Sequence, residues 1–378
     1  MKLLYKLMRA EPGSREGVVV ATSALGIFVN LCLAVVKVAI GAAVSSIAIV
    51  SEGINNASDC ATSVLTIVGA KLSGKHPTKD HPFGFGRIEY LTSLVIAVLI
   101  LITGVELLIS SVKLIFAPEA LSISYATLII IAVSAAVKLA LGTYTIRQGK
   151  RIDSGTLIAV GMDSRNDSVV SVVTIISALV FLIFGVSVDA YAGVITSMFV
   201  LKAGYDVLKD TLSELLGRSG QEELAGKLYE IIRADPIVLN AADMMLHNYG
   251  PDAYSGSVNI EVDHSRTLGE IYADIHALQL RIMHEYNITM VFGMYAVDAD
   301  SEGMRKMRSE IAAFVRSHEH VISFHALYLD EENRDIYCDL IVDYELRDWD
   351  ALRREFTEYM AERYPEDELE LVIETSYV

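Results

Sequence analysis

The sequence predicts an all-α membrane domain of six transmembrane helices at residues 1–216, followed by an α+β region at residues 217–378. Two observations predict this fold class. Apolar residues make up 52% of the chain, and long runs of them fill the sequence between Val18 and Leu216. After Gly217 the composition is that of a soluble protein, and Asp and Glu outnumber Lys and Arg by 33 to 14. A lipid-embedded part and an acidic, solvated part therefore follow one another along the chain.

Six stretches are long enough and apolar enough to cross a bilayer, which takes about 20 mostly apolar residues. They cover residues 18–40, 46–71, 91–116, 122–146, 153–184 and 187–213. We therefore expect a multi-pass protein of the cell membrane (plasma or inner membrane), with the lipid bilayer as a constant partner.

The loops between these stretches predict the orientation. The loops at 41–45, 117–121 and 185–188 contain no Lys or Arg, whereas those on the other side are basic through Lys71, Lys75, Lys79, Arg87, Arg147, Lys150 and Arg151. Because basic loops stay in the cytoplasm, both termini are expected on the cytoplasmic side.

Four polar residues lie inside the second and fifth stretches. The segment SEGINNASDC places Asn55 and Asp59 one helical turn apart, and GMDSRNDSVV does the same for Asp163 and Asp167. Asp59 lies 12 residues from Lys71 and Asp163 lies 12 residues from Arg151. At about 1.5 Å per residue, both are roughly 18 Å from the cytoplasmic border. Since the two helices run in opposite directions, the four side chains are expected at one depth.

Intramembrane acids are costly and usually functional, so this group predicts a metal site. Three carboxylates so close together cannot all stay ionised without a cation. The alternative is hydrogen bonding between protonated acids. The predicted ligands are all oxygen, and the six stretches contain no histidine, which Zn²⁺ would favour. Mn²⁺ fits this donor set better than Mg²⁺, Ca²⁺ or Fe²⁺.

The region after residue 217 contains the same order of elements twice. The first set is helix 221–233, strands 237–249 and 254–263, helix 267–286 and strand 288–297. The second is helix 301–317, strands 320–329 and 335–344, helix 348–363 and strand 369–376. Alternating apolar residues in SVNIEVD and DIYCDLIVDY are typical of half-buried strands. We therefore predict two ferredoxin-like αββαβ modules in tandem, at 217–297 and 298–378.

Composition and motifs argue against several functions. The acidity of the C-terminal region argues against nucleic-acid binding. Three well-separated cysteines form no CxxC pair, so neither a disulfide framework nor a thiolate metal site is expected. The sequence shows no nucleophile–base pair, P-loop or cofactor fingerprint, so we expect neither an enzyme nor a protein with a fixed cofactor.

The chain resembles the cation diffusion facilitator family over residues 1–297. Four motifs carry the resemblance: SEGINNASD, HPFGFGRIEYL (81–91), DSRNDSVVS (163–171) and VDAYAGVITSMFVLKAGYDVLKDTLSELLG (188–217). The resemblance implies a homodimeric exporter that exchanges divalent metal ions for protons by alternating access. It also implies a transport site at Asn55, Asp59, Asp163 and Asp167. Zinc-type members have HxxxD at one or both places, so NxxxD and DxxxD are similar to the manganese-type branch.

Two alternatives to Mn²⁺ export remain open at this point. One is the same exporter with Fe²⁺, Zn²⁺ or Co²⁺ as its main substrate. The other is a membrane-anchored metal sensor whose acidic tail binds ions without transport.

Weaker candidates lie outside the six stretches. His76, Asp80 and His81 lie in a cytoplasmic loop where some relatives bind a second ion, although His81 also fits a structural role in the HPFG turn. His247 falls where some relatives place a cytoplasmic ligand. Glu106 and Lys138 are expected to form an ion pair. The remaining histidines that we considered are expected to be solvated or core residues: His264, His276, His318, His320 and His325.

Overall fold

The computed structural model describes residues 14–43, 47–116, 125–184, 188–217, 222–251, 253–298 and 301–375. Its backbone contacts divide the chain into two units. The first comprises Met1–Arg218 with Tyr249–Ala253, and the second comprises Ser219–Asn248 with Tyr254–Val378.

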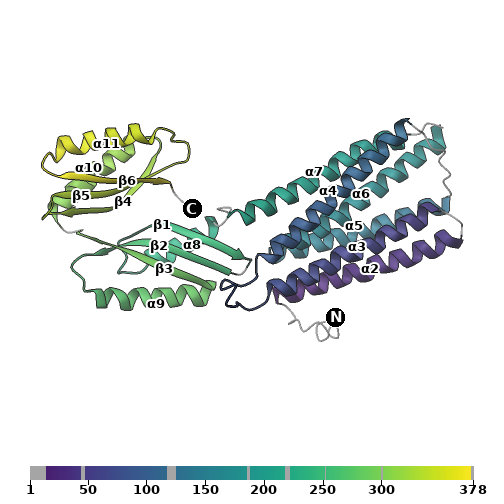
Figure 1. The fold of residues 1–378 in the computed structure, drawn as a ribbon, viewed down its shortest axis with the longest axis horizontal. Helices are drawn as coiled ribbons and strands as arrows, with labels where there is room; N and C mark the ends of the chain where they lie inside the picture. Colours follow the sequence, from purple (N-terminus) through teal and green to yellow (C-terminus); the bar gives the residue numbers. More distant parts are fainter. Residues whose placement is uncertain are drawn as a thin grey trace. The chain divides into compact units, whose positions relative to one another are not determined.

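The first unit is helical. Its described residues form six helices of 27 to 30 residues at the predicted positions, and these run alongside one another (Figure 1). They are α2 (Arg15–Ala43), α3 (Ile47–Ser73), α4 (Ile88–Phe116), α5 (Tyr125–Arg151), α6 (Gly155–Phe184) and α7 (Asp189–Leu215).

Four of these helices, α2, α4, α5 and α6, are long and apolar enough to cross a membrane. The helices α3 and α7 have similar lengths but carry more polar residues, including Glu52 and Asp59 in α3 and Lys202 and Asp206 in α7. The prediction of six spans therefore stays a prediction, whereas a helical transmembrane domain with four clear apolar spans is established. The loop residues 44–46, 117–124 and 185–187, on which the predicted orientation partly rests, lie outside the described residues.

An ion-pair network joins the start of α2 to the turn between α5 and α6. Arg15 forms an ion pair with the buried Glu89 of α4 and donates to the carbonyl oxygens of Ile152 and Asp153, at 2.9 Å each. Ser154 donates to the Glu89 carboxylate at 2.6 Å. Because the Glu89 carboxylate is buried, these donors offset the cost of removing its charge from water.

The second unit has the element order αββαβ twice, as predicted. The first set is α8 (Glu222–Arg233), β1 (Asn240–Gly250), β2 (Ala253–Asp263), α9 (Leu268–Tyr286) and β3 (Ile288–Val297). The second set is α10 (Glu302–Ser317), β4 (Val321–Asp330), β5 (Asp335–Val342), α11 (Trp349–Arg363) and β6 (Glu368–Thr375). Both sets belong to one unit by backbone contacts, so the division at residue 297 and the ferredoxin-like assignment stay predictions.

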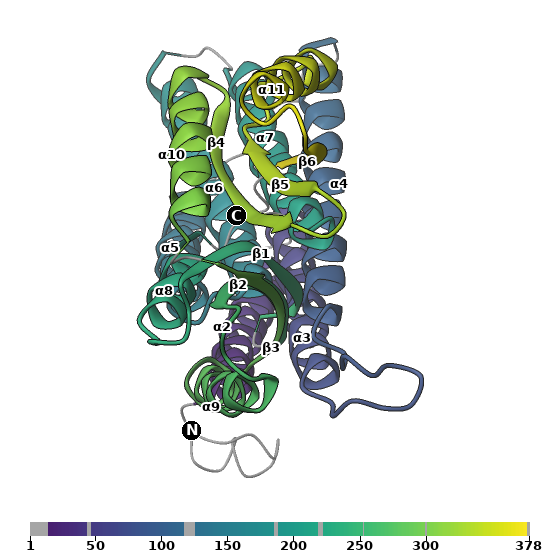
Figure 2. The ribbon, with the colours of Figure 1, turned by 90° about the vertical axis from the view of Figure 1, so that its left-hand side faces the viewer.

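Each set forms its own three-stranded sheet. The strand orders are β1-β2-β3 and β4-β5-β6, with β2 parallel to β3, β4 antiparallel to β5, and β5 parallel to β6. Figures 1 and 2 show α8 and α9 beside the first sheet, and α10 and α11 beside the second.

Each sheet packs an apolar core against its helices. Leu228, Ile260 and Ile282 are fully buried in the first core, and Ile311 and Phe356 in the second. In the second sheet, Cys338 and Leu340 of β5 and Leu371 and Ile373 of β6 face this core. Because side chains alternate along a strand, the residues next to them point to the opposite face of that sheet. That opposite face carries the charged side chains Asp339 of β5 and Glu374 of β6.

Candidate metal centre

Three acids from two helices meet inside the helical unit. Asp59 of α3 and Asp163 and Asp167 of α6 have carboxylate oxygens that all lie within 4.8 Å of one another. All three side chains are half-buried. One divalent ion can therefore be reached by oxygens from all three residues, which is the donor chemistry that Mn²⁺, Mg²⁺ and Ca²⁺ prefer.

A close approach of two glycines holds α6 beside α5 next to this acid cluster. A Cβ atom at Gly142 would lie 2.7 Å from the carbonyl oxygen of Gly161, and one at Gly161 would lie 2.9 Å from that of Gly142. Ser168 of α6 adds a hydrogen bond to the carbonyl oxygen of Ala135, at 2.8 Å. Small residues let membrane helices pack backbone to backbone. These contacts lie on either side of the segment that carries Asp163 and Asp167.

The same packing brings Lys138 of α5 into the acid cluster. Its side chain is buried, and its Nζ atom lies 2.7 Å from Asp59 Oδ2 and 2.5 Å from Asp167 Oδ2. The predicted pairing of Lys138 with Glu106 is therefore wrong, because the nearby carboxylates are those of Asp59 and Asp167. With one ammonium and three ionised carboxylates, the cluster has a formal charge of −2. The sequence did mark Lys138 as an intramembrane charge, but it did not indicate the partner.

Asn55 is exposed at the surface of the unit, one turn from Asp59 on the same helix. Its neighbour Asn56 is 1% exposed and belongs to the side of α3 that faces α2, where Cys60 Sγ lies 3.7 Å from the carbonyl oxygen of Ile27. A further ion pair on that side joins Lys37 of α2 to Glu52 of α3 at 2.9 Å. The structure thus brings three of the four predicted ligands together and leaves the role of Asn55 as a prediction.

The weaker candidates are not gathered into a site within the described residues. His76, Asp80, His81 and His247 are exposed, and none of them belongs to a group of three ligand-type side chains there. Thr78 and His81 exchange two backbone hydrogen bonds of 3.1 Å, and the His81 ring lies 4.5 Å from that of Phe85. These contacts support the structural role of His81 in its turn.

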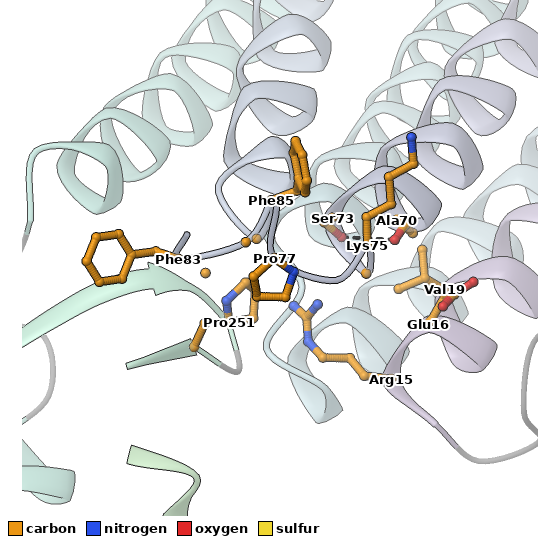
Figure 3. Close-up of a pocket in the computed structure, with 15 residues that line it drawn as sticks. Arg15, Glu16, Val19, Ala70, Ser73, Lys75, Pro77, Phe83, Phe85 and Pro251 are labelled. Atoms are coloured by element: carbon orange, nitrogen blue, oxygen red, sulfur yellow. Dashed lines mark hydrogen bonds between the residues drawn. The ribbon is translucent and has the colours of Figure 1, made fainter. Parts of the chain in front are cut away.

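A pocket of about 250 Å³ lies where the start of α2 meets the end of α3 (Figure 3). Arg15, Glu16, Lys75 and Pro77 are among the residues that line it. Among its described lining residues, Glu16 supplies the single carboxylate, so the pocket does not offer a set of metal ligands.

The described part of the second unit contains one further group of three ligand-type side chains, Asp243, His325 and Glu374. The sequence predicted that His325 is either a solvated or a core residue. It is buried, but it lies among carboxylates. The signal that sequence reasoning missed was a set of charged or ionisable residues within strands, on the face turned away from the helices.

Comparison with known proteins adds independent information. The family model for the cation efflux transmembrane domain matches residues 23–216, slightly more than half of the chain. An uncharacterised transporter of Methanocaldococcus jannaschii is 28% identical over 273 residues, which cover 71% of this chain and 94% of that protein. The manganese efflux system protein MneP of Bacillus subtilis is 27% identical over 225 residues, which cover 58% of this chain and 75% of that protein. The magnetosome protein MamB of Paramagnetospirillum magneticum is 23% identical over 256 residues, which cover 68% of this chain and 86% of that protein.

Proposed function

Because this chain belongs to the cation efflux family, the cation diffusion facilitators, we propose that it exports divalent metal ions from the cytoplasm, with Mn²⁺ as its main substrate and protons as the counter-ion. The observation that carries the proposal is the convergence of Asp59, Asp163 and Asp167, from two helices, within 4.8 Å. An unpaired negative charge inside lipid is too costly to keep without a purpose.

In the proposed transport site, Asp59, Asp163 and Asp167 bind the ion, and the amide oxygen of Asn55 completes the ligand set. All four ligands are oxygen, which supports Mn²⁺ over Zn²⁺. The 27% identity with a manganese efflux protein supports the same substrate.

In the proposed mechanism, Lys138 acts while the transport site is free of metal. Its ammonium contacts two of the three carboxylates that would hold the ion, at 2.7 and 2.5 Å. An arriving divalent ion must displace the ammonium, and its return would accompany release. Protons compete for the same carboxylates, so protonation from outside favours release as the site alternates between inward-open and outward-open states.

We further propose the cell membrane as the location, both termini in the cytoplasm and a homodimer as the working form. The basic loops support the orientation. Membership of the family supports the dimer.

Mn²⁺ flux into proteoliposomes should respond to an imposed pH gradient. With Mn²⁺ outside, an acidic lumen is expected to accelerate uptake, and the luminal pH should rise as Mn²⁺ enters. A fluorescent metal indicator and a pH indicator inside the same vesicles measure both ions. Flux that ignores the gradient and moves no protons would exclude the exchange mechanism, and protein-free vesicles give the leak.

Replacing Asn55 by histidine should shift the preference from Mn²⁺ toward Zn²⁺. An imidazole nitrogen suits Zn²⁺ better than an amide oxygen does, so the Zn²⁺ to Mn²⁺ flux ratio is expected to rise by roughly tenfold, which is about 1.4 kcal/mol of differential affinity. Competition between the two ions in the vesicle assay measures the ratio.

Asn56→His is the matched control, because Asn56 faces α2 and not the acid cluster. If the ratio changes with Asn56→His and stays constant with Asn55→His, Asn55 is not a ligand.

A further inference from the structure

Four ligand-type side chains from four strands meet in the second unit, and we call them the C-terminal cluster: Asp243 of β1, His325 of β4, Asp339 of β5 and Glu374 of β6. His325 is 1% exposed. Its Nε2 atom lies 2.5 Å from Asp243 Oδ2, 3.5 Å from Asp339 Oδ2 and 3.7 Å from Glu374 Oε1. A single ring nitrogen therefore faces three carboxylates, which come from both αββαβ sets.

The hydrogen bonding of His325 is incomplete. Neither of its ring nitrogens makes a hydrogen bond of acceptable geometry with the described residues, although Nε2 is close to Asp243. A buried polar group without a partner costs free energy, and such groups are rare in folded proteins. The nitrogen is aimed at carboxylate oxygens that are themselves ligand-type atoms.

The charges in the C-terminal cluster do not balance either. Within the described residues, His325 is the one group in ion-pair distance of Asp243, Asp339 and Glu374 that can carry a positive charge, and it does so only when protonated. Arg308 lies at 3.4 Å from the buried Glu261 and so is already partnered. Asn259 donates to Asp243 Oδ2 at 3.0 Å but brings no charge.

The ionisation of the acids reflects this imbalance. Burial, and after it the charge of Asp243, raises the pKa of Glu374. Burial also raises the pKa of Asp339, with the attraction of His325 opposing it and the charge of Asp243 adding to it.

Local backbone geometry aims these side chains inward. Ala326, directly after His325, has a φ of 56°, and the register between β4 and β5 is irregular between His325 and Tyr328. Asp243 has a φ of 51° within β1. A bulge of this kind re-aims a side chain out of the regular alternation of a strand.

We propose that the C-terminal cluster is a second metal site, which binds one first-row divalent transition ion through His325 Nε2 and the carboxylates of Asp243 and Glu374, with Asp339 beside it. One imidazole with two or three carboxylates suits Mn²⁺, Fe²⁺, Co²⁺ or Zn²⁺, and is less suited to Mg²⁺ and Ca²⁺, which prefer oxygen alone. The ion would fasten β1 of the first αββαβ set to β4 and β6 of the second, so that metal occupancy stabilises the contact between them.

The test uses the full chain with Asp163→Asn, in detergent, loaded with Mn²⁺ and freed of excess ion. The protein should retain about one Mn²⁺ per chain, and pulsed electron paramagnetic resonance should show the coupling of an imidazole nitrogen to that ion. The proposed transport site has only oxygen ligands, so this nitrogen signature separates the two sites. Adding His325→Gln should remove both the nitrogen coupling and the retained ion.

Two variants complete the test. Glu374→Gln, at a less buried position, should weaken Mn²⁺ binding by about tenfold if this carboxylate is a ligand. His320→Gln, at a partly exposed histidine directly before β4 that pairs with Asp343 at 3.0 Å, should leave the nitrogen coupling unchanged. A size-exclusion elution volume and a circular dichroism spectrum equal to those of the Asp163→Asn protein would show that each variant is folded.

The proposal is overturned if the Asp163→Asn protein retains no Mn²⁺ with nitrogen coupling, or if that coupling survives His325→Gln. Loss of the coupling with His320→Gln would overturn it as well. Because the readout is binding and not flux, failure of the transport proposal and failure of this one are separate results.

Discussion

Asp163→Asn is expected to lower metal flux by about 100-fold or more, while the protein stays folded. Asparagine has the shape of aspartate but lacks the charge, so one of three converging oxygens no longer attracts the ion. Asp163 is the best of the three to change, because the ion pairs of Lys138 go to Asp59 and Asp167 and remain intact. Removing one of three mutually repelling charges should also leave the free energy of unfolding unchanged or slightly higher. Vesicle flux and thermal unfolding measure the two effects.

The matched control is Asp153→Asn, at the turn before α6. Asp153 is exposed and has a φ of 50°, a conformation that asparagine adopts readily, so the backbone should tolerate the change. Full flux with Asp163→Asn, or an equal loss with Asp153→Asn, would remove Asp163 from the transport site.

Lys138→Met is expected to make Mn²⁺ bind more tightly and move more slowly. Methionine keeps most of the volume of the side chain but leaves the three carboxylates without their ammonium. Breaking a buried ion pair from one side costs about 3–5 kcal/mol, and this cost falls on the metal-free state. Bound Mn²⁺ would relieve it, so we expect affinity to rise by roughly 10- to 100-fold and the turnover of transport to fall by a similar factor. Equilibrium binding and vesicle flux on the same preparation measure both quantities.

Thermal unfolding provides a second readout for this variant. Without metal, Lys138→Met should unfold at a lower temperature than the parent protein, and Mn²⁺ should restore most of the difference. Lys37→Met is the matched control, since Lys37 is also a buried lysine, but it pairs with Glu52 at 2.9 Å outside the acid cluster. If Mn²⁺ affinity falls in Lys138→Met, the ammonium is a structural support for the site and not a competitor of the ion.

The sequence predicted the helical positions well because each depends on local information. The lengths of the apolar stretches predicted the positions of α2 to α7 within a few residues, and the alternation of apolar and polar residues predicted those of the six strands. The convergence of Asp59 with Asp163 and Asp167 was also within reach, because helix direction and rise per residue convert sequence positions into depth. Composition alone was not enough for α3 and α7, whose polar residues lower their hydrophobicity below that of the other four.

The partners of Lys138 and His325 could not be predicted in the same way. Which face of α5 meets α6 depends on the contact between Gly142 and Gly161, and glycine leaves no apolar or charge pattern to detect. His325 pairs with Asp339 across the β4–β5 hairpin, but Asp243 and Glu374 come from strands that are distant in sequence. The irregular register after His325 also breaks the simple alternation on which strand predictions rely. In both cases the deciding contact is tertiary, and a single sequence carries no direct record of it.

The contact between Gly142 and Gly161 also bears on how the protein would discriminate between ions of different radius. Two hydrogen atoms, in place of two methyl groups, set the spacing of the backbones that carry Lys138, Asp163 and Asp167. At the proposed transport site, the width available to a cation would therefore depend on residues that have no donor atoms in their side chains and would never touch the transported ion. Efforts to retune the protein for a larger or smaller ion that vary the ligands alone would leave this determinant of size untouched.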